Sequence, residues 1–119
     1  MVTFMLLLGV VRIVEYVDPG GRTPFTKWFA GLDAIVAARV ATMVIRMEQG
    51  NFSNVKGVGS GVFECRIDFG PGYRVYFGKD GDTLVILLAG GTKKRQSKDV
   101  QDAQQRWLDY KRRKMREVN

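Results

Sequence analysis

The stretch from residue 62 to residue 77 constrains the fold of this chain most, because its apolar residues recur at every second position. A period of two is that of a β-strand with one face buried against a core. Gly70-Pro71-Gly72 interrupts the alternation and predicts a turn between two antiparallel strands. The side chains expected on the buried face are Phe63, Cys65, Ile67, Phe69, Tyr73, Val75 and Phe77.

A near-continuous apolar run at residues 84–89 is typical of a central strand buried on both faces. The turn residues Lys79-Asp80-Gly81-Asp82 precede this run, so we expect three consecutive antiparallel strands. The Gly-rich segment 50–61 before them is predicted to be a flexible loop. It lacks the strand-to-helix context of a phosphate-binding loop.

Two helices and a further strand are predicted ahead of this sheet. Thr23-Pro24 provides a cap and a first-turn proline for a short helix that breaks near Gly31. Asp33 is expected to cap a second helix that runs to about Gln49 and has one apolar stripe. The β-branched and aromatic run from Leu6 to Val17 predicts the first strand.

The whole chain, residues 1–119, is predicted to be one α+β domain with the element order β-α-α-β-β-β-α. Ser97 is expected to cap the last helix, which runs from Lys98 to about Arg113. Residues 111–119 are expected to form a basic tail that nothing holds in place.

The residue types exclude several kinds of site. The 119 residues include no histidine and one cysteine, Cys65, so an internal disulfide is impossible and a zinc site lacks its usual ligands. Cys65 lies on the face expected to be buried and is predicted to be a core thiol. We expect no metal and no cofactor, and any catalysis would proceed without a histidine base.

Positive charge is concentrated at the C-terminal end of the chain. Residues 1–92 carry a net charge of +1, whereas residues 93–119 carry +6. A clustered basic end is typical of a nucleic-acid partner. A solubilising basic helix and a docking face for an acidic protein are the alternatives.

The apolar N-terminus raises the question of targeting. Residues 1–11 carry no charge, lack the basic region and cleavage site of a signal peptide, and are too short to span a bilayer. We therefore expect a cytoplasmic protein with no membrane partner. Met5 could equally be the first residue.

The polar face of the predicted strand pair carries candidate functional residues. If Phe69 pairs with Tyr73 across the turn, Arg66 lies opposite Tyr76 and Asp68 lies opposite Arg74. This arrangement is either a functional polar cluster or a solvated face with one cross-strand ion pair.

Several strings in the chain resemble the RelE/ParE superfamily of bacterial toxins, and most closely its HigB-like "addiction module killer protein" branch. The strings are Phe25–Trp28–Phe29, Arg39-Val40, GNFSNVKGVGSGVFECRIDFGPGYRVYF and LLAGGTKKRQSKDVQDA. The likeness covers roughly residues 22–105. It implies a RelE-like antiparallel sheet packed on an N-terminal helical hairpin, with a C-terminal helix.

The resemblance implies the toxin of a type II toxin-antitoxin system. Such a toxin cleaves mRNA in the ribosomal A site and is inhibited by a cognate antitoxin, commonly one with a helix-turn-helix. Arg66 and Arg74 match the family's basic strand residues, and Lys93 matches a basic residue after the central strand. Glu64 stands where relatives carry a lysine. The residues expected to bind RNA are Lys56, Lys94, Arg95 and Gln96.

Metal-free RNA cleavage needs a base at the 2′ oxygen, cations around the phosphorane and an acid at the leaving group. Arg66, Arg74 and Lys93 can supply the cations, since a guanidinium binds phosphate well and is a poor base. Glu64, Tyr76 or a lysine must then transfer the proton, and Tyr76 could alternatively stack on a base.

Two further interpretations remain open from the sequence. The same superfamily includes non-catalytic toxins that inhibit DNA gyrase, and the departure at Glu64 also fits an inactive RNA-binding remnant of a toxin.

Overall fold

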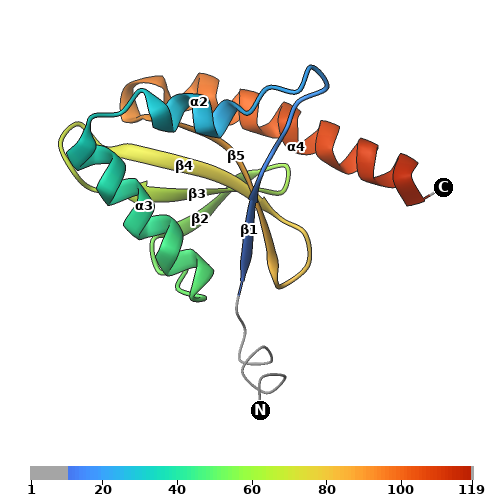
Figure 1. Ribbon diagram of the computed structural model, residues 1–119, viewed down its shortest axis with the longest axis horizontal. Helices are drawn as coiled ribbons and strands as arrows, with labels where there is room; N and C mark the ends of the chain where they lie inside the picture. The colour runs from blue at the N-terminus through green and yellow to red at the C-terminus, as the bar shows by residue number, and fades with distance from the viewer. Residues whose placement is uncertain (1–10, 119) are drawn as a thin grey trace, which may run out of the picture.

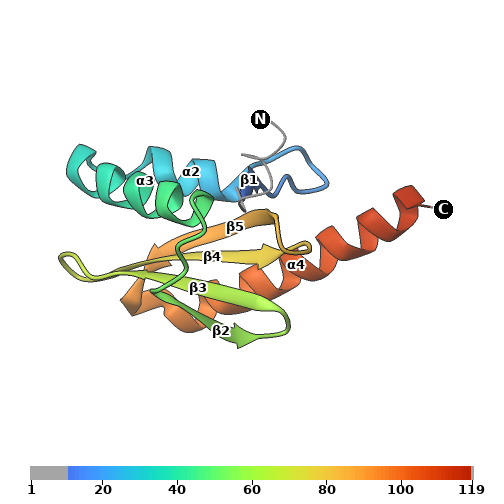
Figure 2. The ribbon, with the colours of Figure 1, turned by 90° about the horizontal axis from the view of Figure 1, so that it is seen from below.

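A computed structural model describes residues 11–118, in which a mixed five-stranded sheet lies between helices on both faces (Figures 1 and 2). The strand order is β1-β5-β4-β3-β2, with β1 parallel to β5 and the other neighbours antiparallel, so the sheet is mixed and not the antiparallel sheet that the resemblance implied. The elements along the chain are β1 (Arg12–Glu15), α2 (Pro24–Ala30), α3 (Ala34–Glu48), β2 (Val55–Gly59), β3 (Val62–Ile67), β4 (Tyr73–Lys79), β5 (Leu84–Thr92), the 3₁₀ turn η1 (Lys93–Arg95) and α4 (Gln96–Val118).

The sheet separates two hydrophobic cores. Helices α2 and α3 cover one face, where Phe25, Val40 and Met47 pack against the strand residues predicted to be buried. Helix α4 covers the other face with Ala103 and Trp107 (Figure 2). The central strand β5 contributes to both cores, as its apolar run predicted.

The predicted first strand is confirmed at Arg12–Glu15, which pairs in parallel with β5. Its expected beginning at Leu6 lies outside the described residues. Within residues 11–118, no helix combines the length and apolarity needed to cross a membrane.

The two N-terminal helices also form at their predicted positions, although the Thr23 side chain makes no capping hydrogen bond. Pro24 occupies the first turn of α2. The Asp33 side chain caps α3 by accepting a hydrogen bond from the Val36 backbone N–H at 3.0 Å. The order of elements from β1 to α3 therefore follows from local sequence signals.

The prediction of a flexible loop at residues 50–61 is wrong, because Val55–Gly59 forms the edge strand β2. Val55 pairs with Cys65 and Lys56 with Glu64, and a register shift lies between Gly57 and Gly59. Ser60 and Gly61 have positive φ angles of 56° and 81° and close the hairpin with β3. The glycines lower the strand propensity, but pairing with a buried neighbour outweighs it. Residues 11–118 therefore contain one strand more than the predicted order.

The register predicted for β3 and β4 is shifted by two residues. Arg66 lies opposite Arg74, and Glu64 lies opposite Tyr76. The reason is the connection: the pairing closes at Ile67 and Tyr73, and Asp68 to Gly72 form a longer loop than expected. A shift of two keeps each side chain on its predicted face. The expected contact between Asp68 and Arg74 does not form.

The last helix differs from its prediction at both ends. Helix α4 starts at Gln96, so Ser97 lies inside it, and it continues to Val118 instead of ending near Arg113. The expected basic tail is therefore helical. Polar contacts hold it: Lys114 pairs with Asp80, and Arg113 donates to the Val17 carbonyl.

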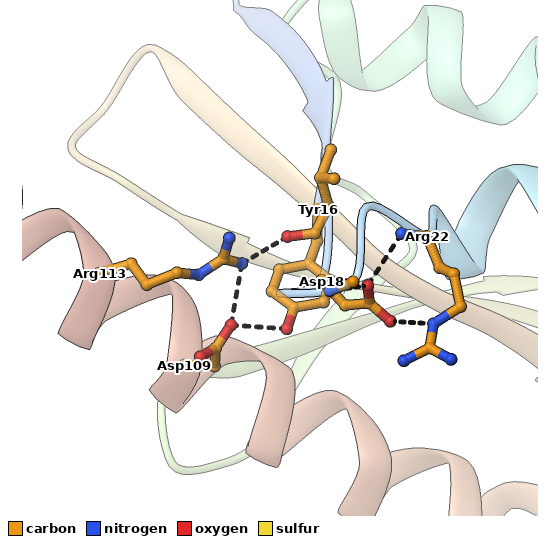
Figure 3. A network of polar contacts seen from close by, with 7 residues as sticks. Tyr16, Asp18, Arg22, Asp109 and Arg113 are labelled. Atoms are coloured by element: carbon orange, nitrogen blue, oxygen red, sulfur yellow. Dashed lines mark hydrogen bonds and ion pairs between the residues drawn. The ribbon is translucent and has the colours of Figure 1, made fainter.

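Figure 3 shows how α4 is joined to the end of β1. The Tyr16 hydroxyl donates to Asp109 at 2.7 Å, and the same carboxylate pairs with Arg113 at 2.8 Å. Burial and the adjacent Asp109 carboxylate raise the pKa of Tyr16 to about 12, so the phenol stays protonated as the donor. This network fixes the C-terminal half of α4.

The glycine pair near the end of the central strand β5 allows helices to approach both faces of the sheet. A Cβ on Gly90 would lie 2.0 Å from the Trp28 ring of α2. A Cβ on Gly91 would lie 1.9 Å from the Asp99 carboxylate of α4. A larger residue at position 90 would displace the Trp28 ring of α2, and one at position 91 would displace the Asp99 side chain of α4.

Candidate functional site

The polar sheet face that sequence reasoning left open to solvent lies largely beneath α4. Glu64 is 0% exposed, Arg74 7% and Tyr76 0%. The alternation placed these side chains on the correct face, and of the two interpretations of this face that the sequence left open, the solvated one is wrong for these three residues. The reason is that α4, which follows the strands in the chain, packs across it.

Three of the sequence-predicted residues meet in a buried cluster, which we call the Glu64 cluster. The Arg74 Nε–H donates to Glu64 Oε1 at 3.0 Å. The Gln96 side chain, from the first residue of α4, donates to Glu64 Oε2 at 2.8 Å. Both carboxylate oxygens are therefore engaged, as a buried charge requires.

Arg74 links this cluster to the surface. Its Nη1 lies 3.8 Å from the point where a Cβ on Gly72 would stand, so the guanidinium is directed toward the loop after β3. Glu64 holds one edge of the planar group and leaves its far edge directed at the end of the sheet. The carboxylate thereby fixes the orientation of Arg74.

Tyr76 is enclosed beside the cluster. Its hydroxyl is buried and has no hydrogen-bond partner among residues 11–118. Burial raises the pKa of Tyr76 far above its usual value, and the charges of Glu64 and Asp99 add to the effect. The structure places this ring in the core of the α4 face, not on a surface where a base could stack on it.

Exposed cations surround the cluster at the same end of the sheet, and we call Arg66, Lys93, Lys94 and Arg95 the basic rim. Arg66 lies directly opposite Arg74 on the neighbouring strand. The backbone N–H of Lys93 donates to the Gly72 carbonyl at 3.2 Å, which joins η1 to the loop between β3 and β4. The fold therefore brings Arg66, Arg74 and Lys93 to one corner.

Two residues expected to bind RNA have other positions. Gln96 is partly buried and hydrogen-bonded to Glu64, so it belongs to the cluster. Lys56 is exposed on the edge strand β2, opposite Glu64 and separated from β5 by β3 and β4. Lys94 and Arg95 lie in a shallow surface depression formed by residues 93–98.

Cys65 is a buried free thiol, as predicted, and is 1% exposed. Burial raises the pKa of this thiol to about 11, and the neighbouring Glu64 charge adds to the shift. The thiolate is therefore scarce at neutral pH, and Cys65 is a core residue. Among residues 11–118, no three His, Cys, Asp or Glu side chains come together as ligands for a metal ion.

Sequence reasoning missed a cleft beside the rim. It holds about 540 Å³ between α2 and the first turns of α4, with Trp28 on one wall and Arg95, Asp99 and Arg106 on the other. One oxygen of Asp99 is buried with no partner among the described residues, and this burial raises its pKa. The double glycine before η1 was the local signal for these close contacts.

Fold and site together define a small α+β protein with a buried ion pair behind one basic end of its sheet. The chain belongs to the family described as phage-derived protein Gp49-like (DUF891), whose model matches residues 27–107. This is a toxin-like family of the addiction module killer type. The resemblance found in the sequence is confirmed at this level.

The matched span begins inside α2 and contains α3, β2 to β5 and the first half of α4. A relative of similar sequence is an uncharacterized protein from Haemophilus influenzae (strain ATCC 51907 / DSM 11121 / KW20 / Rd). It is 44% identical over 80 residues, which cover 66% of this chain and 81% of the relative. Membership of a toxin-like family implies a cognate antitoxin as a partner.

Proposed function

We propose that this protein is the toxin of a type II toxin-antitoxin system and cleaves mRNA on the ribosome without a metal ion. The observation that carries the proposal is the meeting of Arg66, Arg74 and Lys93 at one corner of the sheet. These cations come from three successive segments of the chain. Their convergence supports binding of one phosphodiester.

The chemistry is attack of a 2′-hydroxyl on the adjacent phosphorus, which breaks the bond to the 5′ oxygen of the next nucleotide. Negative charge develops on the phosphorane oxygens, where the planar edges of Arg66 and Arg74 would stabilise it. A lysine ammonium can donate a proton to the leaving 5′ oxygen, and we assign this role to Lys93.

Glu64 and Tyr76 receive positioning roles in this mechanism. Both Glu64 oxygens accept hydrogen bonds within the cluster, and the Tyr76 hydroxyl is buried. Neither group is free to accept the proton from the 2′ oxygen. The proton acceptor must be an exposed group at the same end of the sheet.

A second candidate is a non-catalytic toxin that binds its target, as gyrase inhibitors do. The burial of Glu64 and Tyr76 favours it, because these were the carboxylate and the phenol suited to proton transfer. The exposed basic rim would serve binding in either case.

The test is translation in vitro with mapping of mRNA ends, alongside a gyrase supercoiling assay. We expect ribosome-dependent cuts with the wild-type protein and their loss in Lys93→Ala/Lys94→Ala. The charge-matched control is Arg112→Ala/Arg116→Ala, two exposed cations near the end of α4. Intact mRNA with inhibited supercoiling would establish the second candidate instead.

A further inference from the structure

A second basic groove lies on the sheet face opposite α4, between α3 and the loop that joins β3 to β4. It holds about 420 Å³. Its polar and aromatic lining comes from both sides, namely Arg39, Thr42 and Arg46 of α3 and Asn54, Asp68 and Phe69 of the loops. The mechanism proposed above uses none of these residues.

The central feature of this groove is a planar cation supported by an aromatic ring. The Arg39 guanidinium carbon lies 4.5 Å from the centroid of the Phe69 ring. Phe69 itself packs against the core beneath α3, so the ring is held in place. Arg39 is exposed, and we call its guanidinium over this ring the Arg39–Phe69 platform.

The groove carries an excess of positive charge. Arg39 and Arg46 lie two helical turns apart on α3, and neither makes an ion pair within residues 11–118. Asp68 is the carboxylate among the lining residues. Two exposed arginines against one aspartate favour an anionic ligand.

The groove lies next to Arg66 of the basic rim, at the end of β3. The Arg66 backbone N–H donates to the carbonyl of Asn54, a lining residue, at 3.1 Å. Ile67 and Asp68, which also line the groove, directly follow Arg66 in the chain. A polymer bound at the rim can therefore pass around this strand end into the groove.

We propose that this groove binds single-stranded RNA, with one base stacked on the Arg39–Phe69 platform and a phosphate held by Arg46. The inference rests on the proposed function, which it extends to a second RNA contact. Bases stack on guanidinium planes backed by aromatic rings. A carboxylate of an acidic peptide prefers the N–H edge of a guanidinium. The contact with Phe69 instead supports the plane of the guanidinium, which is the surface on which a base stacks.

The test measures the affinity of the purified full chain for a short fluorescent single-stranded RNA whose 2′-hydroxyls are methylated, so that it cannot be cut. Arg39→Ala and Phe69→Leu should each weaken binding about tenfold, the effect expected for loss of one stacked base. Arg39→Lys, which keeps the charge but not the plane, should weaken it nearly as much. Arg46→Ala should lower the slope of log affinity against log salt concentration by about 1, the change expected for loss of one phosphate contact.

The matched control is Arg12→Ala, which removes an exposed arginine of β1 outside the groove. Thermal unfolding of each variant separates loss of binding from loss of structure. Groove variants that bind RNA as Arg12→Ala does would overturn the inference and leave the proposed function intact. The inference also fails if a polyglutamate peptide, and not RNA, depends on Arg39. A wild-type chain that binds no free RNA would overturn the inference, whereas the proposed function fails only if the translation assay shows no mRNA cuts.

Discussion

The Glu64 cluster and the basic rim use similar residues on one sheet face, yet α4 gives them opposite environments. Arg74 and Arg66 lie directly opposite each other on neighbouring strands. Arg74 is 7% exposed and paired with Glu64, whereas Arg66 is exposed and makes no ion pair within residues 11–118. Burial therefore distinguishes an arginine that Glu64 holds in position from one whose side chain is exposed and unpaired among the described residues.

The largest expected effect is a loss of folding stability when the buried Glu64 cluster is disrupted. Glu64→Ala leaves the Arg74 guanidinium buried without its partner, and loss of one member of a buried ion pair costs about 3–5 kcal/mol. Denaturant unfolding measures the change. Asp68→Ala, which removes an exposed carboxylate, should stay within about 0.5 kcal/mol of the wild type. A Glu64→Ala cost as small as that of the control would mean that the cluster is not a buried pair.

A double variant sharpens the same point. In Glu64→Met/Arg74→Met both charges are replaced by apolar side chains, and such replacements are often neutral for stability. We expect this variant to fold but to cleave no RNA, since the oriented guanidinium is gone. Normal cleavage by the folded double variant would show that Arg74 is dispensable for catalysis.

The next largest effect is expected at Arg66 of the exposed basic rim, and it is an effect on the cleavage rate. Arg66→Ala should lower single-turnover cleavage about 10²- to 10³-fold, as loss of one transition-state donor does. Its free energy of unfolding should change by no more than about 0.5 kcal/mol. An unfolded variant, or one that cleaves at the wild-type rate, would contradict the assignment of Arg66 to the rim.

A smaller loss of stability is expected on the opposite face of the same strand, where Cys65 lies. Cys65→Ser places a hydroxyl in an apolar core at a cost of about 1–3 kcal/mol, without loss of cleavage. Because burial raises the pKa of the thiol to about 11, alkylation of the native protein should be slow. Rapid labelling accompanied by loss of activity would indicate a functional thiol.

The smallest expected effect is a dependence of folding stability on pH, which distinguishes Asp99 from Glu64. Glu64 has two partners, whereas one Asp99 oxygen is buried without any among residues 11–118, and its burial raises the Asp99 pKa. When folding raises the pKa of a carboxyl, the protein loses folding stability as the pH rises from the pKa in the unfolded state, about 4, through the pKa in the folded state. Asp99→Asn should therefore be more stable than the wild type at neutral pH.

Unfolding of both proteins across this pH range measures the difference. The advantage of Asp99→Asn should disappear below pH of about 4, where the wild-type carboxyl is protonated in both states. An advantage that is the same at every pH would have a cause other than titration of Asp99.

Local patterns predicted much of the fold but little of the environment of the site. The Asp33 cap, Pro24 in the first turn of α2 and the buried thiol of Cys65 follow from neighbouring residues alone. Strand β2 escaped prediction because its stability comes from pairing with β3 and outweighs its glycines. The loop length between β3 and β4 likewise depends on where strand pairing ends. For this reason the partner of the Arg74 side chain is Glu64 and not the predicted Asp68.

The sequence by itself determined on which face of its strand each residue lies, because alternation with a period of two depends only on the backbone. It thereby placed Glu64, Arg66, Arg74 and Tyr76 on one side. Only the tertiary structure decided which of them are buried, since that depends on where α4 crosses the sheet after the chain has turned back. Helix α4 covers Glu64, Arg74 and Tyr76 and leaves Arg66 exposed. The physical reason is that a side chain's burial depends on residues far along the chain, whereas its direction depends on its own backbone.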